Sequence, residues 1–336
     1  MEKIENNNQE IKECFDQRDQ KKLLELGLGV KEIEELKHSD MGGTSSSVFI
    51  VETKKEKIAV KRGVAVDPEL NSQREYVFLR LLKKRGGEKI APEPYYQNKK
   101  SDILVMEAVE GEPILELGDK DIADIAGKMA FVHKPEFSRP GIPFEERKEA
   151  TQYERMLEQI DFLEKWFGEM EHFIKNEDFG DSDSLDKIKK AKSQIIQEAY
   201  SARDLFNKSS FSLIHYDLSP GNIIRNKSGN ILFLDWRQAS IGDRAMDIAK
   251  LFYKQSMNEN QRKTFFDAYL SKIEDSNLPE RTAIYYPLIR LASLLWRLRF
   301  LNVDVKNNPQ LGKNVDVKLV KRRLVDDYEY LVALLK

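Results

Sequence analysis

Cysteine is almost missing from this chain of 336 residues, which contains Cys14 and no second thiol. No disulfide can therefore form within the chain, and a reducing compartment such as the cytoplasm is the simplest expectation. The first twenty residues are polar, so they lack the apolar segment of a secretory signal peptide.

Long apolar runs and an excess of one charge are also missing. The longest apolar stretch, residues 289–301, contains three arginines, so no membrane span of about 18 residues is expected. The chain has 55 basic and 57 acidic residues, a formal net charge of −2 that argues against the basic face needed to bind nucleic acid. We therefore expect neither nucleic acid nor a membrane as a partner. Hydrophobic residues make up 40% of the chain, enough for a sizeable core.

The most informative stretch covers residues 211–251 and reads FSLIHYDLSPGNIIRNKSGNILFLDWRQASIGDRAMDIAKL. Its apolar runs predict a buried strand at 211–214, followed by a hairpin that turns at 226–230. The hairpin would bring Asp235 back beside Asn222, next to Asp217 at the end of the first strand.

This predicted arrangement has the side chains that phosphoryl transfer requires. The carboxylate of Asp235 and the amide oxygen of Asn222 suit Mg²⁺, which keeps water and phosphate oxygens in its remaining positions. Asp217 would accept a proton from an attacking hydroxyl or orient it. Ordinary turn roles explain a single Asp in a loop, but they do not explain this ordered set.

Upstream, apolar runs predict strands at 33–37, 48–51, 58–61 and 103–106. The small-residue loop between the first two would let backbone N–H groups approach phosphates; it contains Gly42, Gly43, Thr44, Ser45 and Ser46. Lys61 at a strand end would reach a phosphate, and Glu75, on a helix opened by Asp67-Pro68, would hold it by an ion pair. Solvated surface charges are the alternative for both. Backbone groups after 103–106 would offer hydrogen bonds to an adenine edge.

Most of the remaining chain is predicted to be helical, over 119–133, within 144–206, and over 261–273, 279–301 and 315–335. The region 144–206 has 16 acidic and ten basic residues, which indicates a solvated helical face or a wall that favours a cationic substrate. His133 is expected to be a packing or capping residue. Trp296 is expected in the core; as an alternative, it would join the Tyr285-Tyr286 pair in an aromatic wall for a quaternary ammonium group.

Taken in order, these features resemble the protein-kinase-like fold. The sequences HYDLSPGN from His215, FLDW from Phe233, IGD from Ile241 and DIA from Asp247 resemble the aminoglycoside phosphotransferase and choline kinase superfamily of small-molecule kinases. The likeness covers about residues 33–300. Protein kinases usually have Arg-Asp and Asp-Phe-Gly where this chain has Tyr-Asp and Asp-Trp-Arg, which disfavours a protein kinase.

The resemblance implies an α+β, two-lobed fold. Residues 1–28 would be a helical extension, 29–107 a β-rich N-lobe that binds the nucleotide, and 108–336 a mostly helical C-lobe with a helical insert. Lys61, held by Glu75, would contact the α- and β-phosphates, and the 42–47 loop would cover the triphosphate. Backbone at Glu107 and Val109 would read the purine.

The resemblance also implies the chemistry of the C-lobe. Asp217 would be the catalytic base, and Asn222 and Asp235 would hold Mg²⁺. Two departures stand out: the loop at 42–47 lacks the Gly-x-Gly-x-x-Gly spacing of protein kinases, and Arg237 stands where many such kinases have an acidic residue.

The function expected from the sequence is transfer of the γ-phosphate of ATP, or GTP, to a hydroxyl of a small molecule, as aminoglycoside phosphotransferases do. A cationic acceptor is one option, and choline, ethanolamine or another metabolite is an alternative to an aminoglycoside. A nucleotide-binding regulatory protein that has lost catalysis is the alternative from another class.

Overall fold

The computed structural model describes residues 15, 17–28, 30–36, 46–63, 72–86, 89–134, 136–141, 150–180, 182–206, 211–307 and 315–336. The chain forms two compact units. Unit 1 consists of Met1–Glu116 and Pro220–Ala239, and unit 2 of Leu117–Ser219 and Ser240–Lys336. Within the described ranges, every helix is too short or too polar to span a bilayer.

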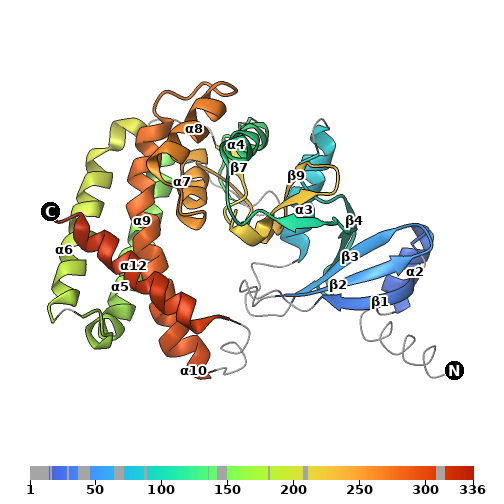
Figure 1. Cartoon of the computed structure of the whole chain (residues 1–336), viewed down its shortest axis with the longest axis horizontal. Coiled ribbons are helices and arrows are strands. Elements are labelled where there is room, and N and C mark those ends of the chain that lie inside the picture. The colour runs from blue at the N-terminus through green and yellow to red at the C-terminus, as the bar shows by residue number, and fades with distance from the viewer. Residues whose placement is uncertain are drawn as a thin grey trace. The chain divides into compact units, whose positions relative to one another are not determined.

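Unit 1 is built on a five-stranded antiparallel sheet with the order β1-β2-β3-β5-β4 (Figure 1). The strands are β1 (Val30–Leu36), β2 (Ser46–Thr53), β3 (Lys57–Gly63), β4 (Pro94–Asn98) and β5 (Ile103–Glu107). Helix α3 (Ser72–Arg85) contacts the sheet and buries Phe78 and Leu79. The strands predicted near 33, 48, 58 and 103 are therefore present.

Helix α2 (Gln17–Glu25) packs on this sheet. Its Leu23 joins an apolar cluster with Val51, Ile58 and Val105. The buried Asp19 accepts hydrogen bonds from Tyr96 Oη at 3.0 Å and Asn98 Nδ2 at 2.7 Å. Burying a charge requires such donors, so Asp19 fixes the helix to strand β4.

A smaller sheet in unit 1 contains the predicted hairpin. Strands β8 (Ile223–Asn226) and β9 (Ile231–Phe233) pair antiparallel around the turn, and β6 (Gly111–Pro113) adds to β8. Gly111 is required here, because a Cβ on it would lie 2.4 Å from the carbonyl oxygen of Arg225.

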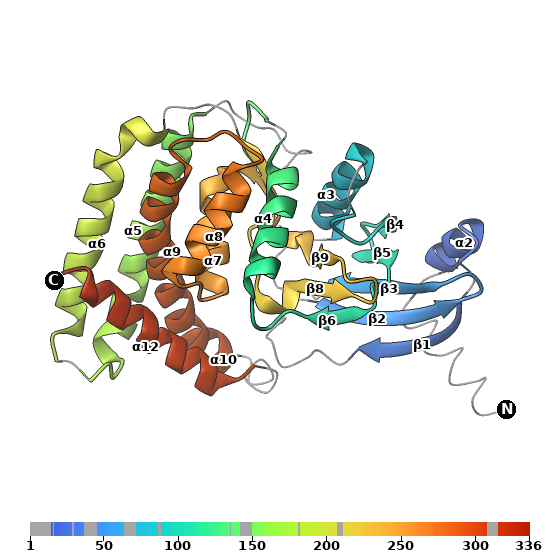
Figure 2. The same cartoon turned by 45° about the horizontal axis from the view of Figure 1, so that its top comes forward.

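Unit 2 is mainly helical. Figure 2 shows α5 (Gln152–Asn176), α6 (Ser184–Ser201) and α9 (Leu278–Arg299) alongside one another, with α12 (Val317–Ala333) across them. Helices α7 (Arg244–Lys254) and α9 pack together, as do α4 (Asp119–His133) and α8 (Glu259–Leu270). Two short strands, β7 (Ser212–Ile214) and β10 (Ser240–Gly242), pair antiparallel.

The structure differs from the sequence expectations at several points. Pro94 begins strand β4, which was not predicted from the sequence; proline is tolerated there because the first residue of a strand needs no ladder N–H. The helix opening at Asp67-Pro68 lies outside the described residues. The core prediction for Trp296 is wrong: its side chain is 47% exposed and stacks on Phe300, because α9 packs through the face that bears Leu291, Leu294 and Leu298.

Candidate active site

Three charged side chains from separate elements of unit 1 lie close together: Lys61, Glu75 and Asp235. The Nζ atom of Lys61, on β3, lies 2.8 Å from Glu75 Oε2 in the first turn of α3 and 2.6 Å from Asp235 Oδ1 after β9. The side chain of Glu75 is 1% exposed, so it needs a cationic partner to remain charged. The ion pair between Lys61 and Glu75 considered from the sequence is therefore present.

The backbone at Asp235 is in the left-handed region, with φ 62° and ψ 68°. Asp is one of the few non-glycine residues that adopt this conformation readily. The following short 3₁₀ turn, Trp236–Gln238, is fixed by two hydrogen bonds: Trp236 N–H donates to Glu75 Oε1 at 3.1 Å, and the indole N–H donates to the carbonyl of Phe233 at 2.8 Å. Glu75 thus positions both Lys61 and the segment that carries Asp235.

Arg237 binds the same carboxylate through two nitrogen atoms of its guanidinium. Its Nε lies 2.9 Å from Asp235 Oδ1, and its Nη2 lies 3.0 Å from Oδ2. Burial alone would raise the pKa of Asp235, but Lys61 and Arg237 together hold that pKa well below its usual range. Asp235 is therefore charged at any physiological pH. We call Lys61, Glu75, Asp235 and Arg237 the Asp235 cluster.

Sequence reasoning missed Arg74, which ties α3 to the end of this segment. Its Nε donates to the carbonyl of Ala239 at 2.9 Å, and its Nη2 donates to the carbonyl of Gln238 at 3.3 Å. One turn of helix therefore supplies two anchors, Arg74 and Glu75. No motif in the sequence marks a side chain that bonds to distant backbone.

The hairpin returns as expected and carries the two predicted metal ligands. Leu234 N–H donates to the carbonyl oxygen of Asn222 at 2.8 Å, which brings the residue before Asp235 back to Asn222. A charged carboxylate and an amide oxygen are the hard donors that Mg²⁺ prefers, so the residues fit this ion. Over the described ranges no group of three or more His, Cys, Asp and Glu is placed to hold a metal.

The remaining predicted nucleotide residues have different outcomes. Gly42, Gly43, Thr44 and Ser45 lie outside the described residues, while Ser46 begins β2 opposite Gly63. At the end of β5 the N–H of Glu107 donates to the carbonyl of Glu93 at 2.8 Å. A purine contact at Glu107 would therefore have to use its carbonyl oxygen. Val109 follows in an irregular, partly exposed segment.

In unit 2, Asp217 lies in the loop after β7, and Asp247 on α7 organises this loop. The carboxylate of Asp247 accepts the N–H of His215 at 2.9 Å and the N–H of Tyr216 at 2.6 Å. The Asp217 N–H then donates to Nδ1 of His215 at 3.2 Å. Tyr216 has φ 69°, a strained value that is often found at functional sites.

His133 supports Asp247 from α4. Its Nε2 lies 3.0 Å from Asp247 Oδ2, and its Nδ1 lies 2.7 Å from the hydroxyl of Tyr269. Burial lowers the pKa of His133, although Asp247 opposes that shift. Burial alone would raise the pKa of Asp247, but His133 and the N–H of His215 lower it. His133 was expected to be a packing or capping residue; it is buried at the end of α4 and, in addition, positions Asp247.

Two lysines on α7 contact the loop that carries Asp217. The Nζ atom of Lys254 lies 3.1 Å from Asp217 Oδ1, and the Nζ atom of Lys250 lies 3.5 Å from the centre of the Tyr216 ring. Burial lowers the pKa of Lys250 to about 7; Asp217 and Asp247 oppose this shift, while Lys254 adds to it. No motif in the sequence predicts a role for these two lysines; only their i, i+4 spacing on one helix is visible there.

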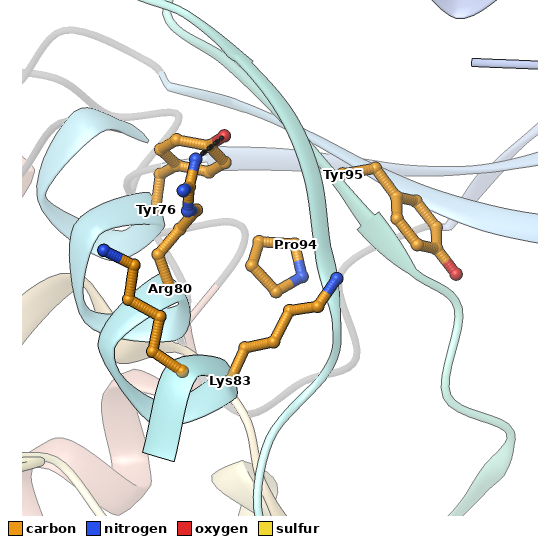
Figure 3. A pocket seen from close by; sticks show the side chains of 6 residues that line it. Tyr76, Arg80, Lys83, Pro94 and Tyr95 are labelled. Atoms are coloured by element: carbon orange, nitrogen blue, oxygen red, sulfur yellow. Dashed lines mark hydrogen bonds between the residues drawn. The ribbon is translucent and has the colours of Figure 1, made fainter. Parts of the chain in front are cut away.

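Unit 1 also has a cavity between α3 and β4. It is lined by Tyr76, Arg80, Lys83, Lys84, Pro94 and Tyr95 (Figure 3). Its walls come from α3 and β4, and none of the predicted site residues lines it. Glu75 and Tyr76 are neighbours in sequence but lie on different faces of α3, so the helix separates this cavity from the Asp235 cluster.

Comparisons with known proteins identify a family and a fold. A family model described as "Phosphotransferase enzyme family" matches residues 40–285. A curated relative, the protein LicA homolog of Metamycoplasma hominis, is 32% identical over 104 residues, which are 30% of this chain and 40% of that protein. The match thus spans less than half the length of that relative.

Solved structures are similar over nearly the whole chain. The choline kinase LicA from Streptococcus pneumoniae has a TM-score of 0.60 at 20% identity, covering 94% of this chain and 96% of that one. A LicA structure in complex with AMP is similar as well. An aminoglycoside phosphotransferase from Alicyclobacillus acidocaldarius has a TM-score of 0.55 at 17% identity, covering 91% of each chain. At these identities the likeness establishes the fold, which is the predicted kinase-like one.

Proposed function

Since the chain belongs to the phosphotransferase enzyme family, we propose that it transfers the γ-phosphate of ATP or GTP to a hydroxyl group of a small molecule. The observation that carries this proposal is the position of Lys61, 2.8 Å from Glu75 and 2.6 Å from Asp235. Two carboxylates hold the lysine side chain in one position, which is what binding a phosphate requires.

In unit 1, Lys61 binds the nucleotide phosphates, while Glu75 positions it. The loop that contains Gly42, Gly43, Thr44, Ser45 and Ser46 covers the triphosphate, and the backbone at Glu107 and Val109 meets the purine. Asn222 and Asp235 hold Mg²⁺, which supplies charge neutralisation to the phosphates when it is bound.

In unit 2, Asp217 acts on the acceptor. The acceptor oxygen forms a bond to the γ-phosphorus, the bond from that phosphorus to the nucleoside diphosphate oxygen breaks, and the hydroxyl proton passes to the Asp217 carboxylate. His215 and Asp247 hold the loop that presents this carboxylate, with Asp247 fixed in turn by His133. Positioning and charge, without a covalent enzyme intermediate, account for the catalysis.

The names of the similar structures provide the first candidates for the acceptor. They include a choline kinase, an ethanolamine kinase and an aminoglycoside phosphotransferase. A cationic acceptor would agree with the acidic composition of residues 144–206. The acceptor must be found by experiment.

The test is acceptor-stimulated ADP release from ATP. We would screen aminoglycosides, amino alcohols, sugars, nucleosides and hydroxy acids, with casein as the control for a protein kinase. We expect a small hydroxyl compound to stimulate release in the wild type and not in the Asp217→Asn variant. Binding of Mg²⁺–ATP without release for any compound would favour a silent regulatory protein, and labelling of casein alone would favour a protein kinase.

A further inference from the structure

The charges beside Asp217 do not suit a cationic acceptor. Lys254 lies 3.1 Å from the Asp217 carboxylate, and its side chain is 30% exposed. Lys250, one helical turn earlier on α7, lies over the ring of Tyr216, the residue before Asp217. An incoming ammonium group would meet two basic side chains beside a single carboxylate, Asp217, and like charges repel.

The acidic side chains around α7 already bind other groups of the protein. Asp247 accepts two backbone N–H groups and pairs with His133. Asp243 and Asp275 both bind the buried guanidinium of Arg281, at 3.2 Å and 2.9 Å. These carboxylates are therefore held by groups of the fold, and Asp247 also acts electrostatically on Lys250.

The aromatic residues considered for a quaternary ammonium site already bind cations of the chain itself. The guanidinium carbon of Arg290 lies 5.0 Å, 5.5 Å and 4.7 Å from the ring centres of Tyr253, Tyr286 and Tyr330. Tyr285 is buried, with its ring edge-on to that of Phe206. The cation–π capacity of this group is thus used internally.

Some of the acidic residues in the 144–206 region are paired with lysines of the same region. Lysines of α6 bind carboxylates of α5 or of the segment before α6, in the pairs Lys189–Glu171, Lys192–Glu164 and Lys187–Asp183. Two of these pairs join α5 and α6 and the third lies at the start of α6, as expected for a solvated face. The composition of this region therefore does not identify a cation-binding wall.

We infer that the acceptor carries an anionic group, a carboxylate or a phosphate, and that Lys250 and Lys254 bind it while Asp217 receives the hydroxyl proton. The inference rests on the proposed kinase function and sets the charge of its acceptor. Both lysines are on one rigid helix, so the anion and the reacting hydroxyl would be held at a fixed separation. In the absence of acceptor, Lys254 neutralises Asp217.

The first test measures anion binding and needs no turnover. Inorganic phosphate is titrated into wild type, Lys250→Met/Lys254→Met, Lys254→Gln, Lys61→Ala and the control Lys263→Met, whose lysine is exposed on α8. We expect phosphate affinity to fall about 10- to 100-fold in the first variant and measurably in Lys254→Gln. Lys263→Met should not change it, and in Lys61→Ala, which lacks the lysine proposed to bind the nucleotide phosphates, the part of the binding that depends on α7 should remain. If the α7 variants bind phosphate normally, the inference is wrong.

The second test compares short alcohols whose other terminal group is cationic, neutral or anionic. ADP release is measured with 3-amino-1-propanol, 1,3-propanediol, 3-hydroxypropanoate and 3-hydroxypropyl phosphate, together with choline and an aminoglycoside. We expect one of the two anionic compounds to be best, which also separates carboxylate from phosphate, and Lys254→Glu to shift the preference towards the amino alcohol. A cationic compound as best acceptor would overturn the inference but leave the kinase function intact. Normal phosphate binding by Lys250 and Lys254 without any release would count against the kinase function instead.

Discussion

At the scale of single residues, Asp235 is a carboxylate of unit 1 that two cations bind. Lys61 and Arg237 both bind its carboxylate, and the left-handed backbone at Asp235 allows Arg237 to reach back over only two positions. A guanidinium that occupies both oxygens of a carboxylate competes with any metal for the same lone pairs. Arg237 must therefore move or share Asp235 when Mg²⁺ binds.

Replacing Arg237 with alanine should raise the affinity for Mg²⁺. Loss of a bidentate, partly buried ion pair leaves Asp235 free to bind the metal, and we expect a gain of about 5- to 50-fold. Calorimetric titration of Mg²⁺ in the presence of ADP measures it. Arg225→Ala, on the same hairpin but bonded to a turn carbonyl, is the control. An unchanged or lower affinity would mean that Arg237 orients Asp235 for the metal.

Replacing Asp217 with asparagine should slow phosphoryl transfer by about 10³-fold and leave nucleotide affinity unchanged. The amide keeps the size of the side chain but cannot accept the hydroxyl proton. Single-turnover kinetics with the identified acceptor separates this effect from binding. Asp267→Asn, at an exposed ion pair on α8, should behave as wild type. A rate close to normal would show that Asp217 is not the base.

At the scale of elements, Arg281 holds together the turn before α7 and the start of α9. Its side chain is fully buried and binds Asp243, the N-cap of α7, and Asp275. Burial alone would lower the pKa of Arg281, but the two carboxylates raise it above its usual range. Arg281 therefore keeps its charge, and the two carboxylates depend on it.

Replacing Arg281 with leucine should reduce the free energy of unfolding by about 3–5 kcal/mol, because two buried carboxylates lose their partner. The urea midpoint, measured with an unchanged slope, gives this value. Arg322→Leu, at an exposed position of α12, is the control and should stay within about 0.5 kcal/mol. A small effect at Arg281 would mean that water replaces the guanidinium.

Long elements were predictable from the sequence, and short ones were not. Helix α4 covers the same residues, 119–133, that its apolar periodicity predicts, since fifteen residues contain four turns of signal. Strands β6 and β10 have three residues each, too few for an alternating pattern. The pairing of β6 with β8 joins segments more than a hundred residues apart and depends on tertiary contacts.

The site was predictable in part for the same reason. Asp217, Asn222 and Asp235 fall within one stretch of nineteen residues, so their order and spacing carry the signal. Lys61 and Glu75 gained their meaning from that stretch. The contacts of Arg74, Arg237, Lys250 and Lys254 depend on backbone conformation and helix packing, which no local pattern encodes.

At the scale of the whole molecule, the pair His133–Asp247 links stability to pH. It connects α4, α7 and the loop after β7, and both side chains are buried. Because burial lowers the pKa of His133, the folded protein holds this ring neutral at a pH where the unfolded chain, with a pKa of about 6.5, takes up a proton. The unfolded state then binds more protons, so stability must fall as the pH falls below that value.

We therefore expect the free energy of unfolding to be level above pH 7 and to decrease between pH 6.5 and 5, by at most about 1.4 kcal/mol per pH unit for this one group. The lowered pKa of Asp247 adds a loss in the same direction only in more acidic solution, below its usual value. Urea unfolding at a series of pH values gives the slope.

The His133→Gln variant tests whether His133 causes that slope. Glutamine can still donate a hydrogen bond to Asp247 but does not titrate, so the variant should be less stable at pH 8 and lose less stability between pH 6.5 and 5. His172→Gln, at an exposed position of α5, is the matched control and should keep the wild-type slope. If His133→Gln retains the full slope, another group causes it. In that case, proton uptake by His133 would not be the cause of the loss of stability at acidic pH.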